Sequence, residues 1–89
     1  MAEGTVTKPE YVTKLVEALA RAIPGADVDA EQVRGERYRF TVLSTHFDGM
    51  GHPERQEQVW DIAEKALDSE SLRKVTMILT LGHEDLPAE

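Results

Sequence analysis

The sequence predicts a single α/β domain of the α+β class, in which a three-stranded mixed sheet packs on two helices in the order α-β-β-α-β. Three observations lead to this prediction. Two segments repeat apolar residues at helical spacing, two others alternate like strands, and glycine- or proline-containing turns separate them. The 89 residues suffice for one small hydrophobic core.

The first predicted helix follows a capping-box pattern at Thr7 and Glu10, and Pro9 suits its first turn. Pro24 and Gly25 end it, because proline disfavours helix at the preceding residue and glycine permits a reversal. The predicted buried stripe of this helix consists of Val12, Leu15, Val16, Leu19, Ala20 and Ile23.

A hairpin of two strands is expected next. Residues 26–29 are predicted to form a short edge strand, and the polar segment 31–36 a turn. In the second strand the aromatic residues Tyr38 and Phe40 alternate with Arg37 and Arg39. Because side chains alternate between the faces of a strand, we expect the aromatic rings in the core and the arginines in water.

The second helix is predicted to begin at Pro53, after a turn rich in glycine. Ser69 is expected to cap a short further turn beyond it. The predicted buried stripe consists of Val59, Ile62, Ala63, Ala66 and Leu67, with Trp60 at its edge.

The last predicted strand covers residues 75–81, where both faces are apolar or β-branched. That pattern is typical of a strand covered on both sides, so we predict that it is the central strand. We assign residues 1–6 to a disordered tail, 7–82 to the domain and 83–89 to an acidic tail.

Composition narrows the classes of function. The formal net charge is −7, from ten basic and seventeen acidic residues, which disfavours nucleic-acid and anionic-membrane binding. The chain has no cysteine, so disulfides and thiolate metal sites are excluded. The sequence shows neither a signal peptide nor a membrane-spanning run, so we expect a cytoplasmic protein.

Five residues around the second helix are the candidates for binding a partner: Gly49, Met50, Gly51, Arg55 and Trp60. Glycines before a helix leave backbone N–H groups accessible, and an exposed tryptophan often anchors an interface. Arg55 occupies the first helical turn, where a cation is disfavoured, so it should have a partner: a local carboxylate, a group of carbonyls or an external ligand.

Catalytic and metal sites are not predicted. No serine–histidine–aspartate set or carboxylate dyad is recognisable, so we expect no enzyme and no cofactor. His52 and His83 are the candidates for metal binding, but no metal-ligand spacing surrounds them, and exposed turn positions are the simpler interpretation.

The segment Phe47-Asp48-Gly49, followed by Arg55 and then by Val59 and Trp60, resembles the BolA-like family of small α/β proteins. The resemblance covers about residues 14–87. It implies a variant of the type II KH-like arrangement, and a non-enzymatic protein-interaction module linked to stress or iron homeostasis.

The same resemblance implies a glutaredoxin partner and a shared Fe–S cluster held through a histidine of the third strand. That histidine falls on Thr76, and the histidine of the family's Arg-His pair falls on Gln56. Metal chemistry here would therefore need substitute ligands such as His52 or His83. The identity of the partner and the oligomeric state are left open.

A third hypothesis is single-stranded nucleic-acid binding through the KH-like sheet. It requires a stripe of basic side chains on one surface. The residues available for that stripe are Arg21, Arg34, Arg37, Arg39, Arg55 and Lys65.

Overall fold

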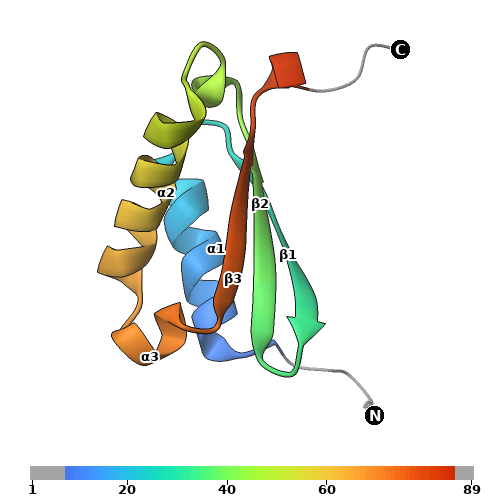
Figure 1. The fold of residues 1–89 in the computed structure, drawn as a ribbon, viewed down its shortest axis with the longest axis vertical. Helices are drawn as coiled ribbons and strands as arrows, with labels where there is room; N and C mark the ends of the chain where they lie inside the picture. Colours follow the sequence, from blue (N-terminus) through green and yellow to red (C-terminus); the bar gives the residue numbers. More distant parts are fainter. Residues whose placement is uncertain (1–7, 86–89) are drawn as a thin grey trace.

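The computed structural model describes residues 8–85, which form an α+β domain with three helices and one three-stranded sheet (Figure 1). The predicted order of helices and strands is confirmed, and a short helix precedes the last strand. Single 3-10 turns follow the second and third strands, at Thr45–Phe47 and His83–Asp85. The elements are α1 (Glu10–Ala22), β1 (Asp27–Arg34), β2 (Arg37–Leu43), α2 (His52–Ala66), α3 (Ser69–Leu72) and β3 (Val75–Leu81).

The sheet has the order β1-β2-β3, antiparallel between β1 and β2 and parallel between β2 and β3. The parallel connection runs through α2, which is the predicted crossover. The prediction that residues 75–81 form the central strand was wrong, because β2 occupies that place. β3 lies at the edge although both of its faces are apolar.

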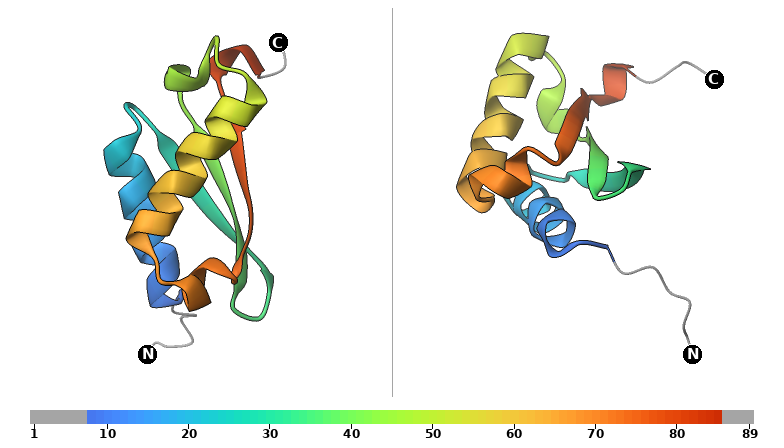
Figure 2. Two further views of the ribbon diagram at one scale, coloured as in Figure 1. Left: turned by 60° about the vertical axis from the view of Figure 1, so that its left-hand side comes forward. Right: turned by 60° about the horizontal axis from the view of Figure 1, so that its bottom comes forward.

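Both long helices lie on one face of the sheet, as the views in Figure 2 show. The opposite face, here called the open face, is not covered by any other described element. Residues that pair across neighbouring strands share a face, which gives the open face three rows. These rows are Glu31–Arg39–Met77, Asp29–Thr41–Leu79 and Asp27–Leu43–Leu81.

β1 is longer than the sequence pattern predicts. It continues to Arg34, which pairs with Arg37, so the turn of the hairpin shrinks to Gly35 and Glu36. Gly35 has a φ of +56°, a conformation that glycine adopts without strain. The second half of this edge strand is exposed on both faces, and three of its four residues are polar, with Val33 as the exception.

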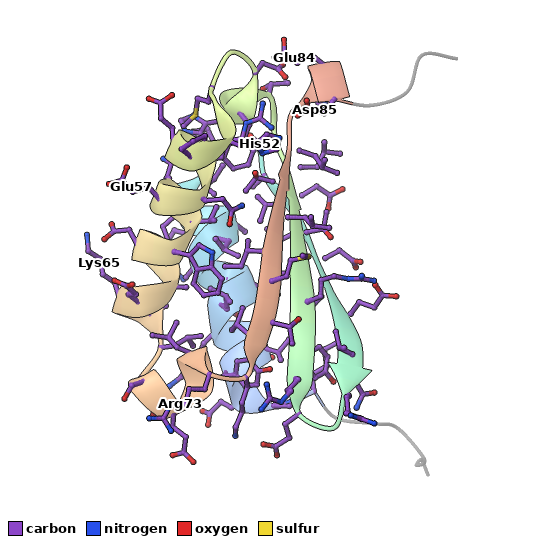
Figure 3. The ribbon with its side chains drawn as sticks, viewed as in Figure 1. His52, Glu57, Lys65, Arg73, Glu84 and Asp85 are labelled. Carbon is purple, nitrogen blue, oxygen red and sulfur yellow. The ribbon has the colours of Figure 1, made fainter. Side chains whose placement is uncertain are left out.

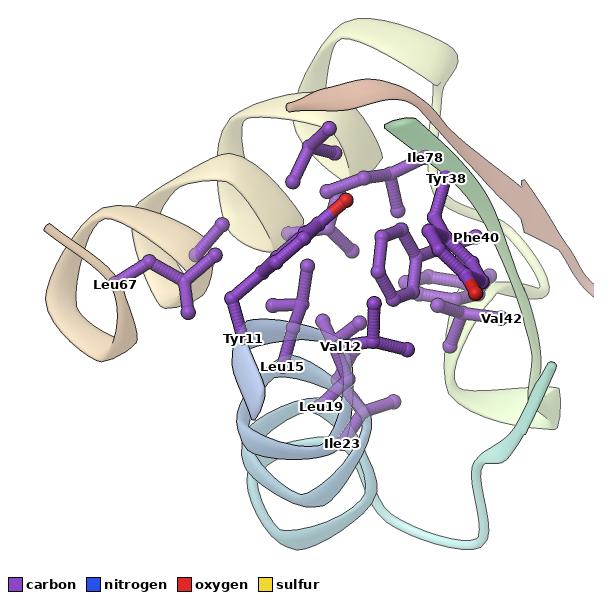
Figure 4. Packing of buried hydrophobic residues seen from close by; sticks show 14 residues of the cluster. Tyr11, Val12, Leu15, Leu19, Ile23, Tyr38, Phe40, Val42, Leu67 and Ile78 are labelled. Carbon is purple, nitrogen blue, oxygen red and sulfur yellow. The ribbon is translucent and has the colours of Figure 1, made fainter. Parts of the chain in front are cut away.

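The core lies between the two helices and the sheet (Figure 4). The aromatic rings of Tyr38 and Phe40 face it, as predicted, while Arg37 is exposed. On α1 the predicted stripe is confirmed except at Ala20, which is exposed, whereas Tyr11 is buried in addition. The buried cluster contains Tyr11, Val12, Leu15, Leu19, Ile23, Tyr38, Phe40, Val42, Phe47, Val59, Ala63, Leu67, Val75 and Ile78.

The helix ends differ from the predicted caps. α1 begins after Pro9 without a side-chain cap bond, and Thr7 lies outside the described residues. α2 begins one residue before Pro53. The expected cap at Ser69 was wrong: the carboxylate of Asp68 caps α3, because it accepts the N–H of Ser71 at 2.8 Å.

Thr76 and Thr80, both on β3, provide a paired test of how threonine hydroxyls contribute to stability, since Thr76 is exposed and Thr80 is buried. The Oγ1 of Thr80 is buried and has no hydrogen-bond partner within residues 8–85, whereas the hydroxyl of Thr76 donates to the carbonyl of Tyr38 at 3.1 Å. We expect Thr80→Val to raise the free energy of unfolding by about 1 kcal/mol, and Thr76→Val to lower it by about 1 kcal/mol. Urea denaturation of both variants measures this, and changes of equal sign would contradict the assignment.

Candidate functional site

Arg55, in the first turn of α2, is the centre of a hydrogen-bond network at one end of the molecule. Its side chain is 4% exposed and lies 5.8 Å from the ring centroid of Phe47. The guanidinium donates to the carbonyls of Phe47 at 2.8 Å, Met50 at 3.0 Å and Thr80 at 3.3 Å. Arg55 therefore joins the turn before α2 to the end of β3.

Asp85 supplies the counter-charge for this buried cation. Its Oδ2 accepts a hydrogen bond from Arg55 at 2.7 Å and another from the backbone N–H of Gly82 at 2.8 Å. The Gly82 N–H and then the Arg55 guanidinium hold the pKa of Asp85 below its ordinary value. The local ion pair expected for Arg55 is thus formed, although its partner comes from the segment predicted to be an acidic tail.

Two further hydrogen bonds link the 3-10 turn that contains Asp85, at His83–Asp85, to the Phe-Asp-Gly turn. The N–H of Glu84 donates to Asp48 Oδ1 and the N–H of Gly49 donates to Glu84 Oε1, each at 3.1 Å. A Cβ at Gly82 would overlap the Asp48 carboxylate and lie 3.1 Å from the Asp48 nitrogen, so a side chain at this position would force the Asp48 turn to shift. Glu84 and Asp85 consequently lie beside the start of α2 (Figure 3).

The five candidates for partner binding differ in accessibility. Gly49 and Gly51 are exposed, Met50 and Trp60 are half-buried against the core, and Arg55 is buried. The exposed apolar patch that would make Met50 and Trp60 an interface is not found at this place. Of the five, only the two glycines are freely accessible.

Gln56 occupies the position where the family resemblance expects a histidine. Its amide nitrogen donates to the carbonyl of Ile78 at 2.9 Å, and its amide oxygen accepts the indole N–H of Trp60 at 3.1 Å. Both ends of the amide are therefore bonded inside the chain. Thr76, the second departure, uses its hydroxyl on the backbone of β2.

The described histidines do not gather. His46 is half-buried and contacts the amide oxygen of Gln58 through Nε2 at 3.2 Å, whereas His52 and His83 are exposed. Within residues 8–85, no group of three or more histidine, aspartate or glutamate side chains is placed to hold a metal ion.

A polar hollow of about 410 Å³ opens at the other end of the molecule, near the start of α1. Three of the charged side chains that line it, those of Glu36, Asp68 and Lys74, are engaged with each other or with backbone. Lys74 contacts Glu36 at 2.7 Å, an interaction that raises the pKa of Lys74, and the Ser71 N–H lowers the pKa of Asp68. Burial raises the pKa of Tyr11, whose hydroxyl is bonded to backbone carbonyls.

Two of the three exposed large apolar side chains in residues 8–85, those of Met77 and Leu79, lie on the open face of the sheet, a site that the residue-by-residue sequence analysis missed. Met77 is 46% exposed and Leu79 is 39% exposed. The half-buried Leu81, next along the same face of β3, and its partner Leu43 on β2 extend this apolar surface. We call these four residues the apolar column. The signal for it was present in the sequence, as the two apolar faces of residues 75–81.

Comparison with protein-family models, with curated proteins and with solved structures returned no match to this chain. None of the described helices has the length and apolar character that crossing a membrane requires.

Arg55→Met tests the network at the start of α2. The variant keeps an apolar stem but leaves three carbonyls and the Asp85 carboxylate without their donor, so we expect the free energy of unfolding to fall by about 3–5 kcal/mol. The matched control, Arg73→Met, changes an exposed arginine at the opposite end and should cost less than about 0.5 kcal/mol. Equal effects in urea denaturation would contradict the role of Arg55.

Asp85→Asn tests the pH dependence. Since the folded-state pKa of Asp85 lies below its ordinary 3.8, its stabilising contribution is present above pH 3.8 and is lost as the pH falls through the lower folded value. We expect the variant to be less stable than the parent at pH 6, and the difference to shrink as the pH falls below 3.8. Urea midpoints measured across this range decide it, and a difference that does not change with pH would be contrary.

Proposed function

We propose that this chain is a non-enzymatic, BolA-like protein-interaction module that binds its partner through the open face of the sheet. The observation that carries the proposal is the apolar column, with Met77 46% and Leu79 39% exposed. The element order and the Phe-Asp-Gly turn before α2 support the BolA-like part of the proposal.

Apolar side chains that stay in water lose the favourable free energy of burial. On its open-face side, β3 exposes Met77 and Leu79 on a surface otherwise rich in charge. Contiguous apolar patches on soluble domains mark interaction sites more often than chance. A partner that covers the column would remove this apolar surface from water.

Three acidic side chains beside the apolar column, here called the acidic column, make the two sides of the open face chemically different. Asp27, Asp29 and Glu31 line β1 in the same three rows, while Arg39 and Thr41 stand between the two columns. A binding surface with an apolar side and an acidic side selects a partner with apolar and basic groups in matching places.

Nucleic-acid binding receives less support, since the six basic residues of the stripe are not gathered on one surface, although the exposed Arg34 and Arg37 pair at the β1–β2 hairpin. Arg55 is buried and Arg39 is ion-paired with Glu31 on the open face. Arg21 and Lys65 line a groove between α1 and α2, away from the sheet's open face. A fluorescent single-stranded oligonucleotide that bound at low salt would revive this alternative.

The double variant Met77→Ser/Leu79→Ser tests the proposed surface. Both side chains are exposed, so we expect the free energy of unfolding to change by less than about 1 kcal/mol, while capture of the partner from native extract is lost. Capture is measured by mass spectrometry of the co-purified proteins, with a visible spectrum of the same sample to report any coloured glutaredoxin complex.

The control for this test is Val33→Ser, which alters a side chain that is 54% exposed at the far end of β1. It should retain every specific partner. A partner that binds the double variant and the control equally well would show that the open face is not the binding surface.

A further inference from the structure

The two edges of the sheet differ in how open they are. On β3 the carbonyl of Ile78 accepts a hydrogen bond from the Gln56 amide at 2.9 Å, and that of Thr80 accepts one from Arg55 at 3.3 Å. Both donors belong to α2, so this helix occupies the outward carbonyls of β3. An additional strand could pair there only by displacing these side chains.

The other edge, on β1, presents its backbone groups outward. The N–H groups of Tyr38 and Ser44 donate to β3 and the adjoining backbone, so the even-numbered residues of β2 bond in that direction. The odd-numbered residues of β2 therefore bond to β1, where their partners are Asp27, Asp29 and Glu31. Because successive residues of a strand point their backbone groups to opposite sides, those of the intervening Val28 and Ala30 point away from the sheet.

No further strand pairs with β1 in the part of the chain that the structure describes. Figure 1 shows β1 at the margin of the sheet, on the side away from α2. Val28 and Ala30 are half-buried side chains that pack against the core, so they offer a small apolar surface below an added strand. The edge thus combines unpaired backbone groups with apolar contacts.

The charges on this edge determine which strand it would accept. Asp27, Asp29 and Glu31 project from β1 onto the open face, and Glu31 is ion-paired with Arg39. Within residues 8–85, neither Asp27 nor Asp29 takes part in an ion pair. A strand lying next to β1 would place every second side chain beside these carboxylates, where lysine or arginine is favoured.

A second copy of the chain does not fit this edge. If two β1 strands paired about a two-fold axis with Val28 and Ala30 bonded, the acidic side chains of one copy would face those of the other. Asp29 would lie opposite Asp27, Asp29 or Glu31, depending on the register. Like charges directly opposite each other destabilise a strand pair, so the edge disfavours self-association.

We propose that the free edge of β1 binds an extended segment of a partner protein as a fourth strand, with lysine or arginine at alternate positions and small apolar residues between them. This inference rests on the proposed function and specifies how the partner binds. The basic side chains pair with Asp27 and Asp29, and the backbone bonds to Val28 and Ala30.

The test uses the full chain and fluorescein-labelled peptides. The probe is a seven-residue peptide of alternating lysine and valine. One control has the same composition with its lysines and valines in two blocks, and another alternates glutamate and valine. Fluorescence anisotropy at about 0.15 M salt, where the Debye length is about 8 Å, measures binding. We expect the alternating basic peptide to bind at least fivefold more tightly than either control, and the amide NMR signals of Val28 and Ala30 to shift.

Two variants localise the binding. Asp27→Asn/Asp29→Asn should weaken it about fivefold or more, and Ala30→Pro, which removes an outward N–H, should abolish it. The matched control Glu57→Gln/Glu64→Gln removes two exposed acidic charges from α2 and should change it less than twofold. Circular dichroism establishes that each variant folds, and the Asp27→Asn/Asp29→Asn result decides the matter if Ala30→Pro does not fold.

Three outcomes would overturn the inference: equal weakening by the two charge variants, equal binding of the block peptide, or concentration-dependent dimers of the parent chain that Ala30→Pro abolishes. Its failure is distinguishable from that of the proposed function. If Met77→Ser/Leu79→Ser loses its partner while both β1 variants retain it, the open face binds the partner and the β1 edge does not.

Discussion

The buried guanidinium of Arg55 is the constraint on which the arrangement of the domain depends. A cation removed from water must be paired, and here three backbone carbonyls and the Asp85 carboxylate supply the partners. These acceptors come from the turn before α2, from β3 and from the 3-10 turn after it. Since α2 is the crossover between the parallel strands, fixing its first turn also fixes where β3 lies beside β2.

The same first turns of α2 determine which parts of the sheet remain available. Arg55 and Gln56, adjacent in sequence, bond to successive outward carbonyls of β3, at Thr80 and Ile78. The Trp60 indole N–H holds the Gln56 amide in the required orientation. Where the family resemblance expects a histidine, this chain therefore has a residue that closes a sheet edge. Metal binding at that position would require breaking the hydrogen bond from the Gln56 amide to the Ile78 carbonyl, which keeps an added strand from pairing with β3.

Sequence patterns predicted the helices well because a helical stripe depends only on local spacing, as the buried Val12, Leu15 and Leu19 illustrate. They failed on strand order. A strand apolar on both faces has the same pattern whether neighbours cover both faces or one face is bare, so β3 was placed at the centre. The sequence also did not predict that Arg55 is buried, since most of its acceptors are backbone carbonyls, which no side-chain pattern reveals. Asp85 lay in a segment interpreted as a tail.

The position of β1 and β3 at the two edges of the sheet also explains how the proposed surface can be specific. Apolar contact with Met77 and Leu79 is non-directional and would accept many partners. Backbone pairing at β1 fixes the direction of a partner segment, but it depends little on side chains. The carboxylates of Asp27 and Asp29 join the two, because they share rows of the open face with the apolar column and border the free edge. A partner must then satisfy apolar, backbone and charge requirements together, and a second copy of this chain, with a net charge of −7, fails the last of them.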